Sequence, residues 1–263
     1  MNEDTLFSVT DQVVLASGAS RGIGRALAEG FAQRGAQVIV TGRDRDTLEA
    51  TARAIAPEGS TVDAMVCDVA DLDQIDSVVT KTIETHGRID TLLNIAGVNR
   101  RRRVETYDVE DFDFILNINL KGAFWTAQRV GRHMLEQGRG AQINIDSLNT
   151  YAPLKGVVPY AMSKGGMSMM TRGMALEWAE RGVRVNGIAP GFILTDLSRK
   201  MWAIPKMKQW CMDHTPMNRF GDVDDLIGTA LYLASDASRF MTGQTLYVDG
   251  GASSGQAWPI DLD

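Results

Sequence analysis

The stretch VVLASGASRGIG, residues 13–24, joins an apolar strand to a glycine-rich turn and the start of a helix. A run that is apolar on both faces is typical of a strand inside a parallel sheet. Glycines in the turn let backbone N–H groups approach a phosphate at the N-terminus of the following helix. The spacing is Gly-x-x-x-Gly-x-Gly and differs from the usual Gly-x-Gly-x-x-Gly fingerprint. Its place directly after the first strand nevertheless favours a nucleotide site.

Short apolar runs alternate with amphipathic segments along the rest of the chain. Strands are expected at residues 13–17, 37–41, 61–67, 91–95, 141–145, 183–188 and 245–248, and helices at 24–34, 44–55, 71–86, 112–136, 159–181 and 222–235. This order predicts an α/β, Rossmann-type, doubly wound parallel sheet of seven strands with helices on both faces. We expect a single domain over residues 1–263. Residues 192–220 lack strand signals and are predicted to form a substrate lid between the sixth strand and the last helix.

The composition narrows the class of protein. The 263 residues carry a net charge of -6, which argues against a general nucleic-acid binder. Two cysteines, Cys67 and Cys211, do not make a disulfide framework and fit a reducing compartment. The first residues lack the apolar core of a signal peptide, and no apolar run reaches membrane-spanning length. The three histidines lack metal-ligand spacing. We expect a cytoplasmic protein without metal, nucleic-acid or membrane partners.

Tyr160 and Lys164 lie four residues apart in a predicted helix, with Ser147 thirteen residues before the tyrosine. Residues four apart share one face of a helix, so the ammonium is expected near the phenol. A neighbouring cation lowers the pKa of a phenol, which would make an acid/base that works near neutral pH. An isolated Tyr-x-x-x-Lys is more often ordinary helix surface, so further motifs must decide.

Several further motifs occur in a fixed order along the chain. They are Ser17–Gly24, with serine where the pattern Thr-Gly-x-x-x-Gly-x-Gly has threonine; residues 94–97, with Ile95 in place of a second asparagine; Asn119; residues 186–191; and residues 248–251. With Ser147, Tyr160 and Lys164 they resemble the short-chain dehydrogenase/reductase family over nearly the whole chain. The departure at Ile95 concerns a structural hydrogen bond and leaves the chemistry intact.

The resemblance implies a catalytic tetrad of Asn119, Ser147, Tyr160 and Lys164. Ser147 would hold and polarise the substrate oxygen, and Tyr160 would donate a proton to a ketone or accept one from an alcohol. Lys164 would favour the tyrosinate and bond the nicotinamide ribose. Asn119 would anchor a water that links Lys164 to solvent. Hydride passes between substrate and nicotinamide, so the protein supplies orientation and charge stabilisation.

The resemblance also implies a binding site for a nicotinamide dinucleotide. The residues expected there are Gly18, Ser20, Arg21, Gly22, Ile23, Gly24, Arg43, Asp68, Val69, Asn94, Ala96, Gly97, Tyr160, Lys164, Pro190, Gly191, Ile193 and Thr195. Thr195 would bond the nicotinamide carboxamide, and Asp68 would meet the adenine. Asp68 could instead be the N-cap of the helix that follows.

The end of the second strand bears on the choice of cofactor. An acidic side chain there would accept the 2′-hydroxyl of NAD, but the position holds Gly42, followed by Arg43. Arg43 and Arg21 are suited to a phosphate monoester, which favours NADP(H) over NAD(H). The alternative is that both arginines are solvated or pair with Asp44 and Asp46.

Four consecutive arginines, residues 100–103, follow the fourth strand at the edge where ligands bind in open α/β sheets. Asp108, Glu110, Asp111 and Asp113 are available as partners, so some of the arginines are expected to be structural or to lie between subunits. We expect one or two to face an anionic substrate, Arg100 or Arg101 first. The substrate residues expected are Arg100, Arg101, Ser147, Asn149 and Tyr160.

Residues 97–101, 171–174, 215–216 and 219–222 give a narrower resemblance, to gluconate 5-dehydrogenases and 2-deoxy-gluconate dehydrogenases. It implies a sugar acid or polyol as a small-molecule substrate, and family membership implies a homotetramer. A 3-oxoacyl-(acyl-carrier-protein) reductase is the alternative enzyme. A dinucleotide-binding regulator without catalysis is the alternative from another class.

Overall fold

A computed structural model describes residues 5–255 and 260, and its centre is one seven-stranded parallel sheet. The strands are β1 (Val13–Ser17), β2 (Gln37–Gly42), β3 (Asp63–Val66), β4 (Thr91–Asn94), β5 (Gly140–Ile145), β6 (Val183–Pro190) and β7 (Thr245–Val248). They lie in the order β3-β2-β1-β4-β5-β6-β7, so the direction of winding reverses between β1 and β4. The predicted doubly wound fold is confirmed. Its switch point is the place where ligands bind in such sheets.

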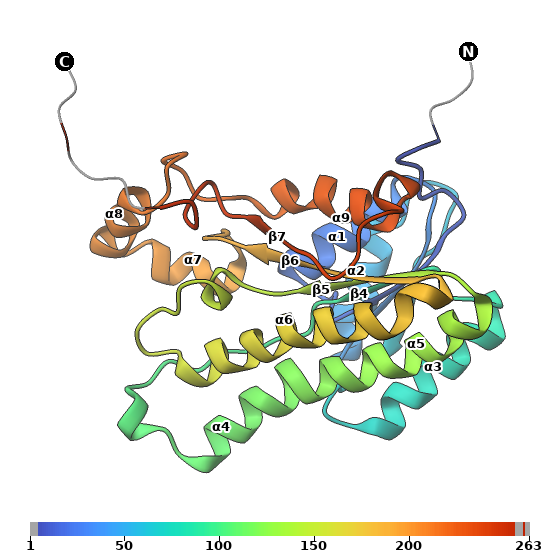
Figure 1. The fold of residues 1–263 in the computed structure, drawn as a ribbon, viewed down its shortest axis with the longest axis horizontal. Coiled ribbons are helices and arrows are strands. Elements are labelled where there is room, and N and C mark those ends of the chain that lie inside the picture. Colours follow the sequence, from blue (N-terminus) through green and yellow to red (C-terminus); the bar gives the residue numbers. More distant parts are fainter. Residues whose placement is uncertain (1–4, 256–259, 261–263) are drawn as a thin grey trace.

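Helices cover both faces of the sheet (Figure 1). They are α1 (Gly22–Ala32), α2 (Arg45–Ile55), α3 (Leu72–His86), α4 (Val109–Leu116), α5 (Ala123–Gln137), α6 (Val158–Trp178), α7 (Asp196–Trp202), α8 (Pro205–Asp213) and α9 (Ile227–Ala234). One apolar cluster packs α1, α2 and α9 against the sheet, and a second packs α3, α5 and α6 against the other face. Each strand is therefore buried between two layers, as the continuous apolar runs predict.

The helix predicted at 112–136 is interrupted in the structure. It consists of α4, a π-helical turn (Asn117–Gly122) and α5, one after the other. A π-turn places one extra residue in the helix and redirects the side chains within it. Asn119 lies in this turn, so the irregularity falls on a predicted catalytic residue.

The predicted lid, residues 192–220, carries α7 and α8, at left in Figure 1. These helices have a small apolar cluster of their own, built on Leu148, Phe192, Trp202 and Cys211. Phe192 lies 5.5 Å from both Trp202 and Trp210, ring centre to ring centre. Helices α7 and α8 are therefore packed on aromatic side chains, while Ile193 at the start of the segment belongs to the cluster of α1 and α9.

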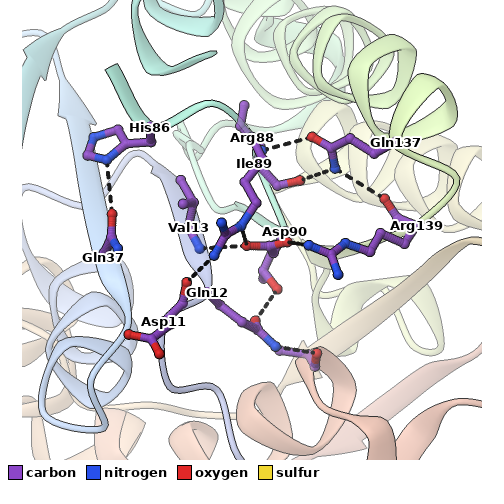
Figure 2. A network of polar contacts seen from close by, with 12 residues as sticks. Asp11, Gln12, Val13, Gln37, His86, Arg88, Ile89, Asp90, Gln137 and Arg139 are labelled. Carbon is purple, nitrogen blue, oxygen red and sulfur yellow. Dashed lines mark hydrogen bonds and ion pairs between the residues drawn. The ribbon is translucent and has the colours of Figure 1, made fainter. Parts of the chain in front are cut away.

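A polar network joins the elements at the amino end of the sheet (Figure 2). Asp90 accepts hydrogen bonds from the Val13 N–H at 2.9 Å and from Arg88 Nε at 2.7 Å. Arg139 approaches its other oxygen at 3.4 Å. The Gln137 side chain bonds both the N–H and the carbonyl of Ile89, at 3.1 and 2.9 Å. These contacts hold β1, β4 and the α5–β5 connection together at the amino end of the sheet, opposite the end that carries the candidate site.

Two further findings concern the described residues. Among residues 5–255 and 260, no helix is both long and apolar enough to cross a membrane. In the same residues, no group of three or more histidine, cysteine, aspartate or glutamate side chains is arranged to hold a metal ion.

Candidate active site

The glycine turn after β1 packs directly against the backbone that follows β4. Gly18 has φ +83°, and a Cβ placed on it would lie 2.6 Å from the Ala96 nitrogen. A Cβ on Gly24 would lie 2.4 Å from the Gly18 carbonyl oxygen. Ser17 Oγ is buried and has no hydrogen-bond partner in the described part of the chain. A turn with glycines at its points of closest backbone contact, at a helix N-terminus, is suited to a pyrophosphate, so these residues fit a dinucleotide.

The two arginines expected near the adenosine end are both exposed. Within residues 5–255, neither Arg21 nor Arg43 forms an ion pair. Asp44 is the N-cap of α2 and accepts a hydrogen bond from the Thr47 N–H at 2.9 Å. Hydrogen bonds from the side chain and from the backbone of Thr47 hold the pKa of Asp44 below its usual range. The alternative in which Arg43 pairs with Asp44 is therefore not seen.

The segment after β3 decides one open alternative. Asp71, not Asp68, is the N-cap of α3 and accepts from the N–H groups of Asp73 and Gln74. Asp68 is half-buried and accepts from the Ala70 N–H at 3.0 Å. The interpretation of Asp68 as the N-cap is wrong.

Two predicted cofactor residues in this region are used in packing. A Cβ on Gly122 would lie 2.6 Å from the carbonyl of Val69, which fixes that residue against the π-turn. The Asn94 side chain is buried and donates to the Ala123 carbonyl and to Asn144 Oδ1, at 2.9 and 3.1 Å. Asn144 in turn donates to Thr171 of α6 at 2.8 Å. Asn94 therefore connects β4 to α5 and, through Asn144, to α6.

Asn119 connects the loop after β4 to helix α6. Its Oδ1 accepts from the Val98 N–H at 2.7 Å, and its Nδ2 donates to the Val98 carbonyl at 2.9 Å and to Ser163 Oγ at 3.1 Å. A Cβ on Gly97 would lie 3.6 Å from this Oδ1 and 3.8 Å from Lys164 Nζ. The side chain of Asn119 thus holds the wall beside the lysine.

Ser147 lies just beyond the end of β5, with its hydroxyl oriented by Asn149. Ser147 Oγ accepts from the backbone and side-chain nitrogens of Asn149, at 3.1 and 3.2 Å. Asn149 Oδ1 accepts from the Leu154 N–H at 2.9 Å, which fixes the amide. Tyr160 is hydrogen-bonded to Ser147 through the side chains. The structure brings the predicted serine and tyrosine together, and it places Asn149 against the serine.

Lys164 is buried beside Tyr160 on helix α6. Its Nζ donates to the Ile145 carbonyl at 2.6 Å and lies 5.9 Å from the centre of the Tyr160 ring. Burial lowers the pKa of Lys164 to about 8, and the charge of Asp146 opposes this shift. Because that value is close to neutrality, Lys164 can lose its proton in a mildly alkaline solution.

The pKa of Tyr160 moves in the direction opposite to the prediction. Burial raises it, and the charge of Asp146 adds to the increase, while the Ser147 hydrogen bond and the charge of Arg101 lower it. A four-residue spacing indicates the neighbouring lysine but not the cost of burying a phenolate, which is the largest effect on this pKa. Tyr160 is therefore neutral near pH 7, the form that donates a proton.

The predicted residues after β6 pack against the end of β7 and against the glycine turn. Pro190 ends β6, and a Cβ on Gly191 would lie 2.6 Å from the Asp249 Cα. Ile193 is buried in the cluster that holds α1 and α9. Thr195 is the N-cap of α7 in a capping box with Ser198, and its methyl group faces Gly22 of the glycine turn. The Thr195 hydroxyl, which was expected to bond the nicotinamide carboxamide, therefore accepts a hydrogen bond from the Ser198 N–H instead.

The four arginines divide into different environments. Arg100 and Arg102 both form ion pairs with Asp111, whose carboxylate is 1% exposed. Arg100 also lies 4.3 Å above the Phe114 ring. Arg101 and Arg103 are exposed, and neither forms an ion pair among the described residues. Of the two arginines named first for the substrate, Arg100 is committed to Asp111, and Arg101 is close enough to Tyr160 to lower its pKa.

Two buried carboxylates at the site were missed as functional candidates. Asp111 appeared only as one of four partners for the arginines, and nothing in its pattern marked it as buried. Asp146 directly precedes Ser147 and is 3% exposed. Its position between an apolar strand and the predicted catalytic serine was a signal that could have been used, because a charged residue there is seldom solvated.

Comparisons with known proteins give consistent similarities. A family profile described as enoyl-(acyl carrier protein) reductase matches residues 18–253. The gluconate 5-dehydrogenase of Gluconobacter oxydans (strain 621H) is 38% identical over 251 residues, covering 95% of this chain and 98% of that protein. A 3-oxoacyl-(acyl-carrier-protein) reductase of Thermotoga maritima is 38% identical over 240 residues, covering 91% of this chain and 97% of that protein.

A solved structure is similar in fold and sequence. The crystal structure of a gluconate 5-dehydrogenase from Burkholderia cenocepacia J2315, in complex with NADP and tartrate, aligns with a TM-score of 0.91 and 37% identity. The alignment covers 95% of this chain and 98% of that one. The residues matched by the family profile, 18–253, include both the glycine turn and the Ser147, Tyr160 and Lys164 group.

Proposed function

We propose that this chain, which belongs to the short-chain dehydrogenase/reductase family, interconverts a hydroxyl and a keto group on a sugar acid with NADP(H). Membership of the family makes the protein a nicotinamide-dependent oxidoreductase that acts on CH–OH groups. When bound, the dinucleotide supplies or accepts the hydride. The residues suited to hold it are the glycine turn, Asp68 and the backbone after β4 and β6. The protein's own part is to bind, orient and move one proton.

Tyr160 and Ser147 perform the proton step in this proposal. Ser147 donates a hydrogen bond to the substrate oxygen, because its own acceptor sites are taken by Asn149. In ketone reduction, the neutral phenol of Tyr160 gives its proton to that oxygen as the carbon becomes a carbinol. In alcohol oxidation, the proton returns to the phenolate. Preorganised donors aimed at an oxygen that gains charge are a large part of such catalysis.

Arg101 is the observation that carries the proposed substrate class. Its guanidinium is exposed, forms no ion pair in the described chain and acts electrostatically on Tyr160. The same loop is held against the segment before α6 by the Arg102 N–H, which donates to the Gly156 carbonyl at 3.0 Å. An uncompensated guanidinium beside the proton donor is suited to a carboxylate on the substrate.

The test compares Arg101→Ala with Arg103→Ala, which removes the neighbouring unpaired charge. We expect Arg101→Ala to lower kcat/KM for keto-gluconates by about 10- to 100-fold, the usual loss of a charge-assisted hydrogen bond. A neutral hydroxyketone is expected to lose much less, which corrects for the effect of Arg101 on Tyr160. Arg103→Ala should behave as wild type. Equal losses for the acid and the neutral ketone would contradict the proposed substrate class.

NADP(H) is the proposed cofactor because Arg21 and Arg43 are exposed and unpaired within residues 5–255, at the turn and at the end of β2. A 2′-phosphate would give both guanidiniums a partner. The measurement is kcat/KM for NADPH and NADH in the wild type and in Arg43→Ala. We expect a strong preference for NADPH that Arg43→Ala reduces. Equal use of NADH by the wild type would contradict the preference.

The 3-oxoacyl-(acyl-carrier-protein) reductase is retained as a second candidate on a specific observation, the 38% identity to such an enzyme. A panel of gluconate, keto-gluconates and acetoacetyl thioesters separates the two. Turnover restricted to thioesters would exclude the sugar-acid proposal. Turnover of any of these compounds would exclude a regulator without catalysis.

We further propose a homotetramer located in the cytoplasm. Helix α6 supports the assembly, because Met162, Met169 and Leu176 are exposed on it. A Cβ on Gly165 or Gly173 would meet nothing within 4 Å, so a neighbouring helix could approach closely there. Light scattering during size-exclusion chromatography tests the assembly, and the mass of a monomer would contradict it.

A further inference from the structure

Asp146 is a buried carboxylate that none of the roles above employs. It follows β5 directly, and its N–H donates to the Ile188 carbonyl of β6 at 2.7 Å, which fixes the backbone. Thr150 donates to its Oδ1 at 2.6 Å. Its Oδ2 is buried and has no hydrogen-bond partner among the described residues. A buried carboxylate with an unsatisfied oxygen is costly, and such groups persist where they have a function.

The surroundings of Asp146 connect it to the catalytic pair. Lys164 Nζ is bonded to the carbonyl of Ile145, the residue next to Asp146. The charge of Asp146 raises the pKa of three groups: Lys164 and Tyr160, which lie on α6, and Tyr247, which lies on β7. Tyr151 contacts Tyr247 edge to face at 6.1 Å.

Asp249 after β7 is the other carboxylate that acts on Tyr247. Its two oxygens accept from the N–H groups of Gly251 and Ser253, at 2.9 and 2.8 Å. Of these two carboxylates at the carboxyl end of the sheet, Asp146 alone keeps an unpartnered oxygen.

We propose that Asp146 is a positioning residue that acts through Lys164 and Tyr160, keeping the lysine charged and the phenol protonated as the pH rises. The inference rests on the proposed role of Tyr160 as the proton donor. A negative charge favours the protonated form of any neighbouring acid or ammonium, so its effect on both residues has the same sign. Asp146 therefore widens the pH range for ketone reduction on its alkaline side.

The titration of Asp146 itself lies below the pH range that it is proposed to extend. Burial raises the pKa of Asp146 to about 6. Three weaker effects lower this pKa: the Thr150 hydrogen bond, the charge of Lys164 and the hydrogen bond from the Ser147 N–H. Above this value the carboxylate is charged and supports the pair. Below it Lys164 and Tyr160 are protonated in any case, so the loss of this charge changes neither group. Removal of the Thr150 hydroxyl would raise that pKa further, without removing the charge at alkaline pH.

The first experiment is the pH profile of kcat/KM for ketone reduction in four proteins: wild type, Asp146→Asn, Thr150→Val and Asp90→Asn. Asp146→Asn is expected to move the alkaline limb to lower pH by about one unit, the scale expected of a nearby charge. Thr150→Val should keep the wild-type alkaline limb, because the carboxylate of Asp146 stays charged at that pH. Asp90→Asn, a distant carboxylate at the other sheet edge, should reproduce the wild-type profile. An unchanged alkaline limb in Asp146→Asn would overturn the proposal.

The second experiment needs no substrate. The ultraviolet absorbance of tyrosinate is followed as the pH is raised, in wild type and Asp146→Asn, each with and without Tyr160→Phe. Subtracting the curve of the Tyr160→Phe protein from that of its parent gives the titration of Tyr160 alone. We expect its midpoint to fall by about one pH unit in Asp146→Asn. A purely structural role would lower the melting temperature and leave this midpoint in place, which overturns the proposal. Absence of turnover on every sugar acid would instead contradict the proposed function. The titration would still decide whether Asp146 acts on Tyr160.

Discussion

The amino and carboxyl ends of the same parallel sheet treat buried polar groups in opposite ways. At the amino end, Asp90 receives the Val13 N–H and two guanidiniums, and its network is fully partnered (Figure 2). At the carboxyl end, buried oxygens without a hydrogen-bond partner in the described residues occur at four positions, Ser17, Asn94, Asn99 and Asp146. The first end holds the strands in register. The second keeps unsatisfied groups that a ligand or a moving proton can use.

The largest expected effect separates activity from stability at the carboxyl end. Lys164→Met should lower kcat/KM by about 10³-fold, within the range for loss of acid–base assistance. Its free energy of unfolding at pH 7 should stay within about 1 kcal/mol of wild type. Relief from burying an ammonium offsets the lost bond to the Ile145 carbonyl. Steady-state kinetics and urea unfolding measure the two quantities. A stability loss as large as that of a core truncation would break the comparison.

The same variant tests the sign of the pH dependence. A lysine whose pKa falls on folding, here to about 8, binds its proton more weakly in the native state than in the unfolded chain. Between about pH 8 and the unfolded value near 10.4, the unfolded state holds more protons, so this group makes the protein more stable as pH rises. Lys164→Met should remove that contribution from the pH course of unfolding. An identical course in both proteins would contradict the lowered pKa.

The opposite pattern is expected from Asp90→Ala at the amino end. The change removes the acceptor of the Val13 N–H and the partner of Arg88, and it should lower the free energy of unfolding by about 2–4 kcal/mol. Values of kcat and KM should match those of wild type, because the network lies at the far edge of the sheet. Asp90→Asn, which keeps an oxygen for the Val13 N–H, is the graded control. A loss of kcat in folded Asp90→Ala would show that the two ends are coupled.

The smallest effect sharpens the comparison within the amino end. Arg139 is 68% exposed and lies 3.4 Å from Asp90. Exposed ion pairs contribute little, so Arg139→Ala should cost no more than about 0.5 kcal/mol, and less at high salt. Urea unfolding at two ionic strengths measures this difference. A loss equal to that of Asp90→Ala would mean that the arginine, not the Val13 bond, holds the network.

The sequence was most informative about the positions of the strands. β1 and β7 occupy the predicted residues, and the central strands deviate by one or two positions at their ends. β3 was predicted over 61–67 and spans only Asp63–Val66, while β7, the strand at the other edge of the sheet, matches its prediction. The π-turn at Asn117–Gly122 could not be predicted, since its residues continue the helical pattern on both sides.

Motif order could indicate which residues meet at the site, but it could not give their electrostatics. Ser147, Tyr160 and Lys164 come together as the family resemblance implies. The pKa of Tyr160 depends on burial and on Asp146, neither of which appears in a four-residue spacing. Arg100 and Arg101 were equivalent in sequence. They differ in space because the buried Asp111 pairs with Arg100 and leaves Arg101 unpaired within the described chain.

The separate apolar cluster under residues 192–220 has a consequence for local unfolding. Segments with a core of their own open as cooperative units, at a lower free energy than the central strands. The amides of α7 and α8 should therefore exchange with deuterated solvent together and earlier than those of β5. Leu148 belongs to this cluster and directly follows Ser147. Ser147, the proposed catalytic serine, is thus expected to lie at the boundary between strands that exchange slowly and a segment that opens without them.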